Sequence, residues 1–385
     1  MITTLTDDHK LDDHFLATLL DYYIKHEGYS AIEQVYWDLR YHKYKISRKL
    51  IGYFNNTIIA CAHQQHLISS IAMFYDMLSH GFGANNRAVM SLLHACIDRC
   101  QLDTSEQILQ VMEEALQKPA PIHQYTVLIR GCVQQGQIET ANNIFIKLLQ
   151  HYKQEERDNL TLLSSAYTYM IQGYFKSNQI NEAESLYQQY RQLQYELFLK
   201  KYKYKNNHEY KMKVKEADTL KKPLINAMIE GYGLLGQSKK LNEFISQNYI
   251  EKFKDVETLA TLIQAKLQYG DVKGAELHLE FALKRYDISD LHPSIEKVLA
   301  SFALDGNISA CEHWAKVLKS RNEKKKKTAI ATTTLLVEAL LVCYGQAGHF
   351  EKLKELYKEV NRDKNILLET GVYNKINNEW LKNCT

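Results

Sequence analysis

The chain has 385 residues, of which 45% are hydrophobic and 24% are charged, and it contains only 4 Pro and 16 Gly. This length supports a large buried core, and the scarcity of Pro and Gly argues against folds of short strands and hairpins, which need such residues at their turns. The net charge of +3 does not by itself indicate a nucleic-acid ligand, because the distribution of charge matters more than its sum.

Pairs of short apolar stripes recur along the chain at the three- and four-residue steps of a helix, which predicts a series of helical hairpins. The first copy has a weak pattern, and Pro119 and Pro121 end the third. The predicted copies are Asp13–Ser47, Ile51–Asn85, Asn86–Ala120, Ile122–Glu156, a fifth from Ser164, Lys222–Val256, Val256–Asp290, His292–Lys326 and Thr334–Leu368, with a partial tenth from Val372.

The clearest copy reads YTVLIRGCVQQGQIETANNIFIKLL from Tyr125 to Leu149. Gly136 stands between its two apolar stripes, where a turn between helices favours a residue that tolerates positive φ. Gly131 and Ala141 put one small residue on each helix, which predicts a close approach of the two helices. The fifth copy repeats the spacing with Gly173, Asn178, Ala183 and Tyr187.

Where copies abut directly, the period is about 35 residues, which fits a solenoid of helical hairpins and excludes a heptad coiled coil. A single hairpin has too small a core to stand alone, so neighbouring hairpins stack. We therefore predict an all-α fold, a right-handed α-solenoid with an extended concave face, that occupies residues 1–385 as one domain. An insertion of about Gln194 to Leu220 interrupts it.

The pattern Tyr-Thr-x-Leu-Ile-x-Gly followed by Gly-x-x-x-x-Ala-x-x-x-Phe, between Tyr125 and Phe145, resembles the pentatricopeptide repeat family, and Tyr167 to Tyr187 repeats it. The related tetratricopeptide repeat places Gly directly after the Leu of its first helix. Here one further residue precedes Gly131, Gly173 and Gly231, which favours the pentatricopeptide interpretation.

The resemblance implies binding of single-stranded RNA, with each repeat presenting side chains to one base. It places base contacts at Asn55, Asn85, Thr126, Thr168 and Asn226. Asn55 with Asn85 matches a specificity pair of the family and suggests a pyrimidine. An alternative interpretation is that Thr126, Thr168 and Asn226 are polar residues that cap the starts of helices.

Other copies depart from the family pattern at the base position of the first helix. Met90 and Ala260 lack a suitable hydrogen-bonding group, and Glu296 and Glu338 would repel a nearby phosphate unless they accept from cytosine or pair with Lys. Decoding of a specific RNA sequence is therefore not expected along the whole array.

The insertion is rich in Lys and Tyr, and it reads LKKYKYKNNHEYKMKVK after Phe198. Cations that meet phosphates and rings that stack on bases are typical of single-strand binding. We expect Lys200, Lys201, Lys203 and Lys205 to contact the RNA backbone, the alternative being a solvated helix that Lys and Tyr prolong. A second basic run, Lys324–Lys327, is interpreted as a solvated loop.

The sequence contains no phosphate-binding Gly-rich loop, no nucleophile motif and no zinc-deaminase motif, so we expect no enzyme activity and no cofactor. His63 and His66 lie beside Cys61, but without a second cluster we interpret them as turn residues and expect no metal site. The 7 Cys form no Cys-x-x-Cys pair, and we expect reduced, mostly buried thiols.

Two hypotheses follow. The first is a non-catalytic adaptor that binds single-stranded RNA in the concave groove and works with proteins of RNA processing or translation, without a membrane. The resemblance implies a mitochondrial location, although the amino-terminal segment resembles no presequence, and the cytoplasm is the alternative. The second is a tetratricopeptide-like scaffold that grips a peptide or partner helix. A basic groove would favour RNA, and an acidic or apolar groove would favour protein.

Overall fold

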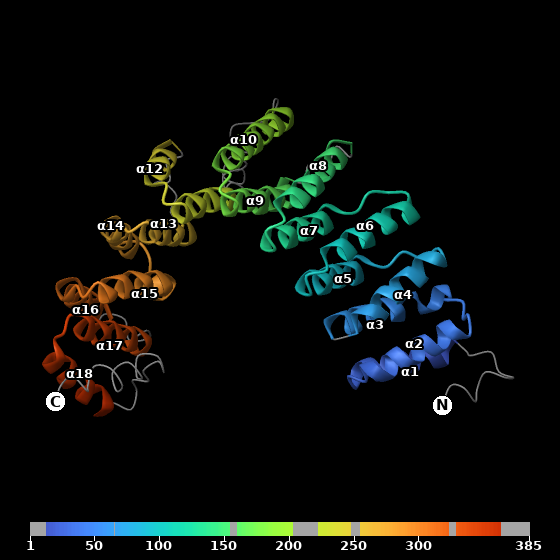
Figure 1. Ribbon diagram of the computed structural model, residues 1–385, viewed down its shortest axis with the longest axis horizontal. Coiled ribbons are helices and arrows are strands. Elements are labelled where there is room, and N and C mark those ends of the chain that lie inside the picture. The colour runs from blue at the N-terminus through green and yellow to red at the C-terminus, as the bar shows by residue number, and fades with distance from the viewer. Residues whose placement is uncertain are drawn as a thin grey trace. The chain divides into compact units, whose positions relative to one another are not determined.

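The computed structural model describes residues 13–64, 66–154, 160–202, 222–247, 255–322 and 329–362. All regular structure within these ranges is helical, which confirms the predicted all-α class built from helix-turn-helix repeats (Figure 1). Within the same ranges, no helix has both the length and the apolar character that crossing a membrane requires. The partial tenth repeat from Val372 lies outside the described residues.

The chain divides into two compact units, Met1–Pro223 and Leu224–Thr385. A single continuous solenoid over residues 1–385 stays a prediction, and each unit is described here by itself. The helices of unit 1 are α1 (Asp13–Lys25), α2 (Tyr29–Tyr41), α3 (Ile51–His63), α4 (Leu67–Ser79), α5 (Asn86–Asp98), α6 (Leu102–Leu116), α7 (Ile122–Gln134), α8 (Ile138–Gln154), α9 (Leu160–Lys176) and α10 (Ile180–Tyr202), with a 3-10 turn, η1 (Arg48–Leu50), before α3.

Unit 2 starts within a helix over residues 222–234. Its other helices are α12 (Ser238–Gln247), α13 (Val256–Gln268), α14 (Val272–Leu283), α15 (Ile288–Leu304), α16 (Ile308–Asn322), α17 (Ala329–Gln346) and α18 (Phe350–Arg362). Three first helices, α9, α15 and α17, begin about one turn before the predicted starts at Ser164, His292 and Thr334.

The early start of α15 has a physical reason. The predicted start at His292 is followed by Pro293, a residue type that is favoured in the first turn of a helix. In the structure Pro293 lies inside α15. Ile288 and Leu291, in the turn before it, are buried in the core of unit 2. Burial of these two side chains outweighs the one backbone hydrogen bond that Pro293 removes.

The turn inside the hairpins uses left-handed backbone, as the sequence predicted at two positions. Gly136 has a φ of 75° and Asn178 a φ of 58°. Both residues tolerate this region, Gly because it lacks a Cβ and Asn because its short side chain can bond locally. At Cys100, in the turn between α5 and α6, a residue with no such preference also has a φ of 58°. The packing of the two flanking helices therefore imposes the turn even where the residue does not favour it.

Gly131 makes room between two hairpins. A Cβ built on it would lie 2.8 Å from Cγ1 of Ile97, which is on α5 of the preceding hairpin. Gly173 shows the same relation, since a Cβ there would lie 2.7 Å from Cδ1 of Ile138. The prediction that Gly131 serves the approach within its own hairpin is wrong about the partner, because periodicity shows that a residue is small but not which helix it faces.

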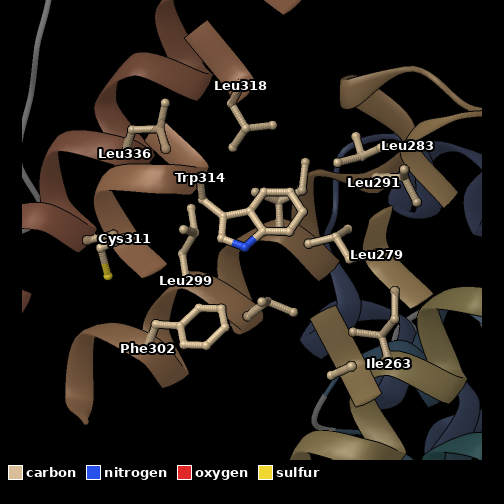
Figure 2. Close-up of a cluster of buried hydrophobic side chains, with 14 of the residues drawn as sticks. Ile263, Leu279, Leu283, Leu291, Leu299, Phe302, Cys311, Trp314, Leu318 and Leu336 are labelled. Carbon is tan, nitrogen blue, oxygen red and sulfur yellow. The ribbon is translucent and has the colours of Figure 1, made fainter. Parts of the chain in front are cut away.

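Helices α13 to α17 of unit 2 share a core around Trp314 of α16 (Figure 2). The indole is 1% exposed, and its neighbours come from several helices, including Leu279 of α14 and Leu299 of α15. The indole Nε1–H donates to Oε1 of Glu276 at 2.8 Å, which satisfies the one polar atom of the ring. Side chains far apart in sequence thus share one core, as stacked repeats require.

Candidate nucleic-acid interface

The first helices of the hairpins form one face of unit 1. Helices α3, α5, α7 and α9 pack against one another in sequence, whereas the second helices of neighbouring hairpins contact each other much less (Figure 1). We call the solvent side of this row of first helices the first-helix face of unit 1. A stack of hairpins curves toward the side on which its helices pack more closely, so this side is the concave one. The predicted base positions of unit 1 all lie on or beside these first helices.

Asn55 and Asn85 are brought together by the fold. Asn55, on α3, is 3% exposed, and its Nδ2–H donates to the Ile51 carbonyl at 2.8 Å. Its Oδ1 accepts from the backbone N–H of Asn85 at 2.8 Å. Asn85 is the N-cap of α5, and its own Oδ1 accepts from the Ala88 N–H at 2.8 Å. The pair therefore links two neighbouring hairpins and caps a helix, a role that both polar side chains fill without a ligand.

Thr126 and Thr168 occupy equivalent places on α7 and α9. The Thr126 hydroxyl donates to the Ile122 carbonyl at 2.9 Å, and the Thr168 hydroxyl donates to the Ser164 carbonyl at 2.8 Å. Both side chains are buried. These bonds reach back one turn within the helix, which is not the geometry of an N-cap. Each oxygen keeps acceptor capacity, since a hydroxyl has two lone pairs.

Asn226 takes the corresponding place in the helix over residues 222–234 of unit 2, and its side chain is half-buried. Its Oδ1 is fully buried and has no hydrogen-bond partner within the described ranges. A buried amide oxygen without a partner costs free energy. Among the predicted base contacts, Asn226 is therefore the residue whose polar group has the greatest need of a partner.

A second row of side chains lies one helical turn beyond the base positions of unit 1. Its members are Ile59 on α3, His94 on α5, Arg130 on α7 and Gln172 on α9. Sequence reasoning missed this row. The signal was present, because each residue stands four positions after Asn55, Met90, Thr126 or Thr168, and residues at that spacing share a helix face.

His94 and Arg130 make contact across the α5–α7 boundary. A guanidinium Nη2 of Arg130 donates to Nδ1 of His94 at 3.1 Å. Burial, together with the charge of Arg130, lowers the pKa of His94 below its usual value of 6.5. Both side chains are half-buried, and Arg87 at the start of α5 and Lys176 at the end of α9 are exposed cations. This part of the first-helix face is cationic and polar.

The first helices of unit 2 differ in charge. The position that Arg130 holds in α7 is Glu230 in the helix over residues 222–234, and α15 and α17 carry Glu296 and Glu338 at their base positions. Glu296 is exposed. These first helices of unit 2 therefore carry acidic side chains at places where α7 carries Thr126 and Arg130.

Two of the four predicted backbone contacts lie beyond what the structure describes. Lys203 and Lys205 lie outside the described residues, as does the rest of the insertion to Lys221. Lys200 and Lys201 belong to the last turn of α10, whose backbone continues as a helix to Tyr202. The start of the insertion therefore prolongs a helix, which agrees with the alternative interpretation for that part. The run Lys324–Lys327 also lies outside the described residues.

The residues considered for a metal are engaged elsewhere. Nδ1 of His66 lies 2.7 Å from Oε2 of Glu33, and Nε2 of His63 lies 3.5 Å from Oγ of Ser91. Cys61 is fully buried, and burial raises the pKa of its thiol to about 12. In the described part of the chain, no group of three or more His, Cys, Asp or Glu residues could hold a metal ion.

Comparisons with known proteins agree with the repeat pattern. The family model for the PPR repeat, the pentatricopeptide repeat, matches residues 125–151 and 165–194, which are the hairpins of α7 with α8 and α9 with α10. No curated protein matches the chain.

Similar solved structures include the pentatricopeptide repeat protein PPR10 from maize, at 14% identity and a TM-score of 0.44, over 96% of this chain and 56% of that one. PPR10 in complex with an 18-nt psaJ RNA element is similar at 14% identity and a TM-score of 0.37, over 94% of this chain and 55% of that one. The chain thus spans about half the length of these proteins.

Proposed function

Because two hairpins of this chain match the PPR repeat family model, we propose that the chain binds single-stranded RNA along its first helices, without catalysing a reaction. The observation that carries the proposal is a cluster of polar and cationic side chains on three adjacent first helices, namely His94 on α5, Thr126 and Arg130 on α7, and Thr168 on α9. The family model matches the hairpins that begin with α7 and α9, and α5 precedes the match. Single-strand binding combines such cations with groups that meet unpaired bases.

The proposed base contacts are Asn55, Asn85, Thr126, Thr168 and Asn226. The free lone pairs of the two Thr hydroxyls and the unpartnered Oδ1 of Asn226 support a role in accepting hydrogen bonds from base edges. The bonds of Asn55 and Asn85 show that these two also hold the hairpins together. Lys200, Lys201, Lys203 and Lys205 are proposed contacts to the RNA backbone.

RNA binding is tested by fluorescence-anisotropy titration of the full chain with a random single-stranded RNA pool and with duplex DNA, at two salt concentrations. We expect tight binding of the single strand that weakens as salt rises, because counterions are released when cations meet phosphates. Absence of binding at low salt would overturn the proposal.

The base contacts are tested by replacing Thr126→Val, Thr168→Val and Asn226→Ala together. We expect RNA affinity to fall at least about tenfold, since each lost hydrogen bond costs about 1 kcal/mol. Thr57→Val is the matched control, because the Thr57 hydroxyl makes the same bond to the Tyr53 carbonyl, at 2.8 Å, on a first helix. An unchanged affinity in the triple variant would remove the base-contact assignment.

The cellular role is proposed as mitochondrial RNA processing, stability or translation, in association with proteins of those processes; the repeat family supports it. Subcellular fractionation of the tagged full chain with a protease-protection assay tests the location. A protected mitochondrial signal is expected, and a wholly cytosolic signal would contradict it.

A protein-binding scaffold is the second candidate, and the acidic side chains Glu230, Glu296 and Glu338 on the first helices of unit 2 favour it there. A basic peptide or partner helix would suit that surface. If the chain binds no RNA but does bind a partner protein, the protein-binding scaffold is the better description of its function.

A further inference from the structure

Among the residues that the structure describes, Arg130 is a cation held in place without an anionic partner. Its side chain is half-buried on α7, and Nη2 donates to Nδ1 of His94 at 3.1 Å. Its Nε is fully buried and has no hydrogen-bond partner in the described part of the chain, and no ion pair of Arg130 occurs there. Burial of a charge is costly unless a group of opposite sign is near. An anionic ligand would offset this cost.

The contact also fixes the proton of His94. Since Arg130 only donates, Nδ1 of His94 must accept, so the neutral ring carries its hydrogen on Nε2. The charged and titratable groups that face His94 are Arg130 on α7, Asp98 on its own helix α5, and His63 on α3. Arg130 and His63 oppose protonation, and Asp98 favours it. An anion beside Arg130 would add a second favourable charge.

The position of this pair on the first-helix face suits the phosphate of a bound nucleotide. Thr126 and Arg130 are one turn apart on α7, which puts their Cβ atoms about 5–6 Å from each other. A base held at Thr126 therefore has its sugar and phosphate within reach of Arg130. In the helix over residues 222–234 of unit 2 the same position is Glu230, so that helix lacks the cation that α7 carries.

We propose that Arg130 and His94 together bind one phosphate of single-stranded RNA, and that His94 takes up a proton as the phosphate binds. The inference rests on the proposed function and adds a residue pair and a coupling to pH. Arg130 supplies the fixed charge and paired donors, a geometry that matches phosphate oxygens. While neutral, His94 positions Arg130; once protonated, its Nδ1 carries a hydrogen and no longer accepts from Arg130, and both side chains donate to the phosphate.

The first test compares salt dependence. Affinity of the full chain for a labelled random 14-nucleotide RNA pool is measured between about 50 and 200 mM salt. For Arg130→Met we expect affinity to fall about tenfold at low salt, and the slope of log affinity against log salt to become shallower by about 0.7, the value for one phosphate of a single strand. Lys358→Met, which removes an exposed cation of α18, is the control and should change neither quantity.

The second test compares pH dependence at constant ionic strength, with His94→Gln. Its amide oxygen can still accept from Arg130, but the side chain cannot gain a proton. We expect the affinity of the unchanged protein to rise as pH falls from about 7.5 to 6.0, by less than about tenfold per pH unit, the limit for one proton. In His94→Gln this rise with falling pH should be smaller, because the Gln side chain gains no proton.

The outcomes separate the two proposals. An unchanged protein that binds no RNA overturns both. An unchanged protein that binds RNA, with the same salt slope in Arg130→Met and the same pH dependence in His94→Gln, overturns only the phosphate site. If circular dichroism shows that the melting temperature of Arg130→Met is far below that of the unchanged protein, Arg130→Lys is used as the test variant instead. Since Lys keeps the charge but lacks the paired donors, unchanged affinity in Arg130→Lys and unchanged pH dependence in His94→Gln would overturn the site.

Discussion

At the scale of single residues, Glu113 joins three helices of unit 1. One oxygen of this α6 carboxylate accepts from the Tyr125 hydroxyl of α7 and from the Ala120 N–H, the latter at 2.7 Å. The other accepts from Nζ of Lys147, on α8, at 3.0 Å. Burial alone would raise the pKa of Glu113, but these hydrogen bonds outweigh it and hold the pKa below the usual value of 4.5.

Replacing Glu113→Gln should destabilise the protein at pH 7 by about 1–3 kcal/mol, because Tyr125 and Lys147 lose a charged acceptor. A carboxyl whose pKa is lowered by folding stabilises fully above its unfolded pKa, and this contribution disappears as pH falls through the folded pKa. The difference from the unchanged protein should therefore shrink below about pH 4.5. The difference in free energy of unfolding is measured at each pH by urea unfolding, monitored by circular dichroism.

Glu114→Gln is the matched control for this prediction. Glu114 is exposed on the same helix and accepts from Nε2 of Gln110 at 3.0 Å. Exposed side-chain pairs contribute little to stability. The free energy of unfolding of this variant should therefore be close to that of the unchanged protein, both at pH 7 and below about pH 4.5. Equal losses in the two variants would show that Glu113 has no special role.

At the scale of secondary-structure elements, the contact between neighbouring first helices decides where a small residue is required. Gly131 and Gly52 both lie in first helices, α7 and α3, but only Gly131 has a near neighbour, Ile97 of α5. A Cβ on Gly52 would meet nothing within 4 Å. The same substitution is therefore expected to act in opposite directions at the two positions.

Gly131→Ala should destabilise the protein by about 1 kcal/mol. Ala gains about 1 kcal/mol of helix propensity over Gly, but overpacking against Ile97 costs about 1–3 kcal/mol. Gly52→Ala should stabilise by about 0.5–1 kcal/mol, since it gains the propensity with no clash. Thermal and urea unfolding of both variants check this, and stabilisation by Gly131→Ala would show that Ile97 moves aside at no cost.

At the scale of the whole molecule, a stack of repeats is expected to confine the effect of a core defect to the repeats around it. In a stack of repeats each repeat contacts its neighbours, so stability is close to a sum of local terms. Trp314, fully buried among side chains of several helices of unit 2 (Figure 2), is the largest such contributor in that core.

Trp314→Ala should cost about 3–5 kcal/mol of local stability in unit 2. Native-state hydrogen exchange should show lower protection of amides in α13 to α16, because the cavity weakens the core that these helices share. Protection of α5 and α7 in unit 1 should stay as in the unchanged protein. An equal loss in both units would mean that the chain unfolds as one cooperative body.

Much of the local architecture was predictable from the sequence. The starts of α1, α3, α5, α7 and α13 agree with the predicted repeat starts. The left-handed turns at Gly136 and Asn178 were also predicted and are confirmed. These features depend on the periodicity of apolar residues and on the backbone freedom of single residues, both of which are local.

The candidate site was predictable only in part. The family resemblance named Thr126 and Thr168, and the structure places them on adjacent helices. It did not show that the Asn55 amide bonds to the Asn85 backbone, or that His94 meets Arg130. These residues are roughly one repeat apart, and the spacing along a single repeat cannot tell how two neighbours are rotated against each other.

The sequence by itself determined the helical hairpins, their turns and the resemblance of two of them to the pentatricopeptide repeat, because each of these follows from residue types at fixed short spacings. Only the tertiary structure decided that Gly131 faces Ile97, that Glu113 joins three helices and that Arg130 lies beside His94. The reason is physical: such contacts depend on side-chain direction and on the packing of one hairpin against the next, which no periodicity within one repeat records.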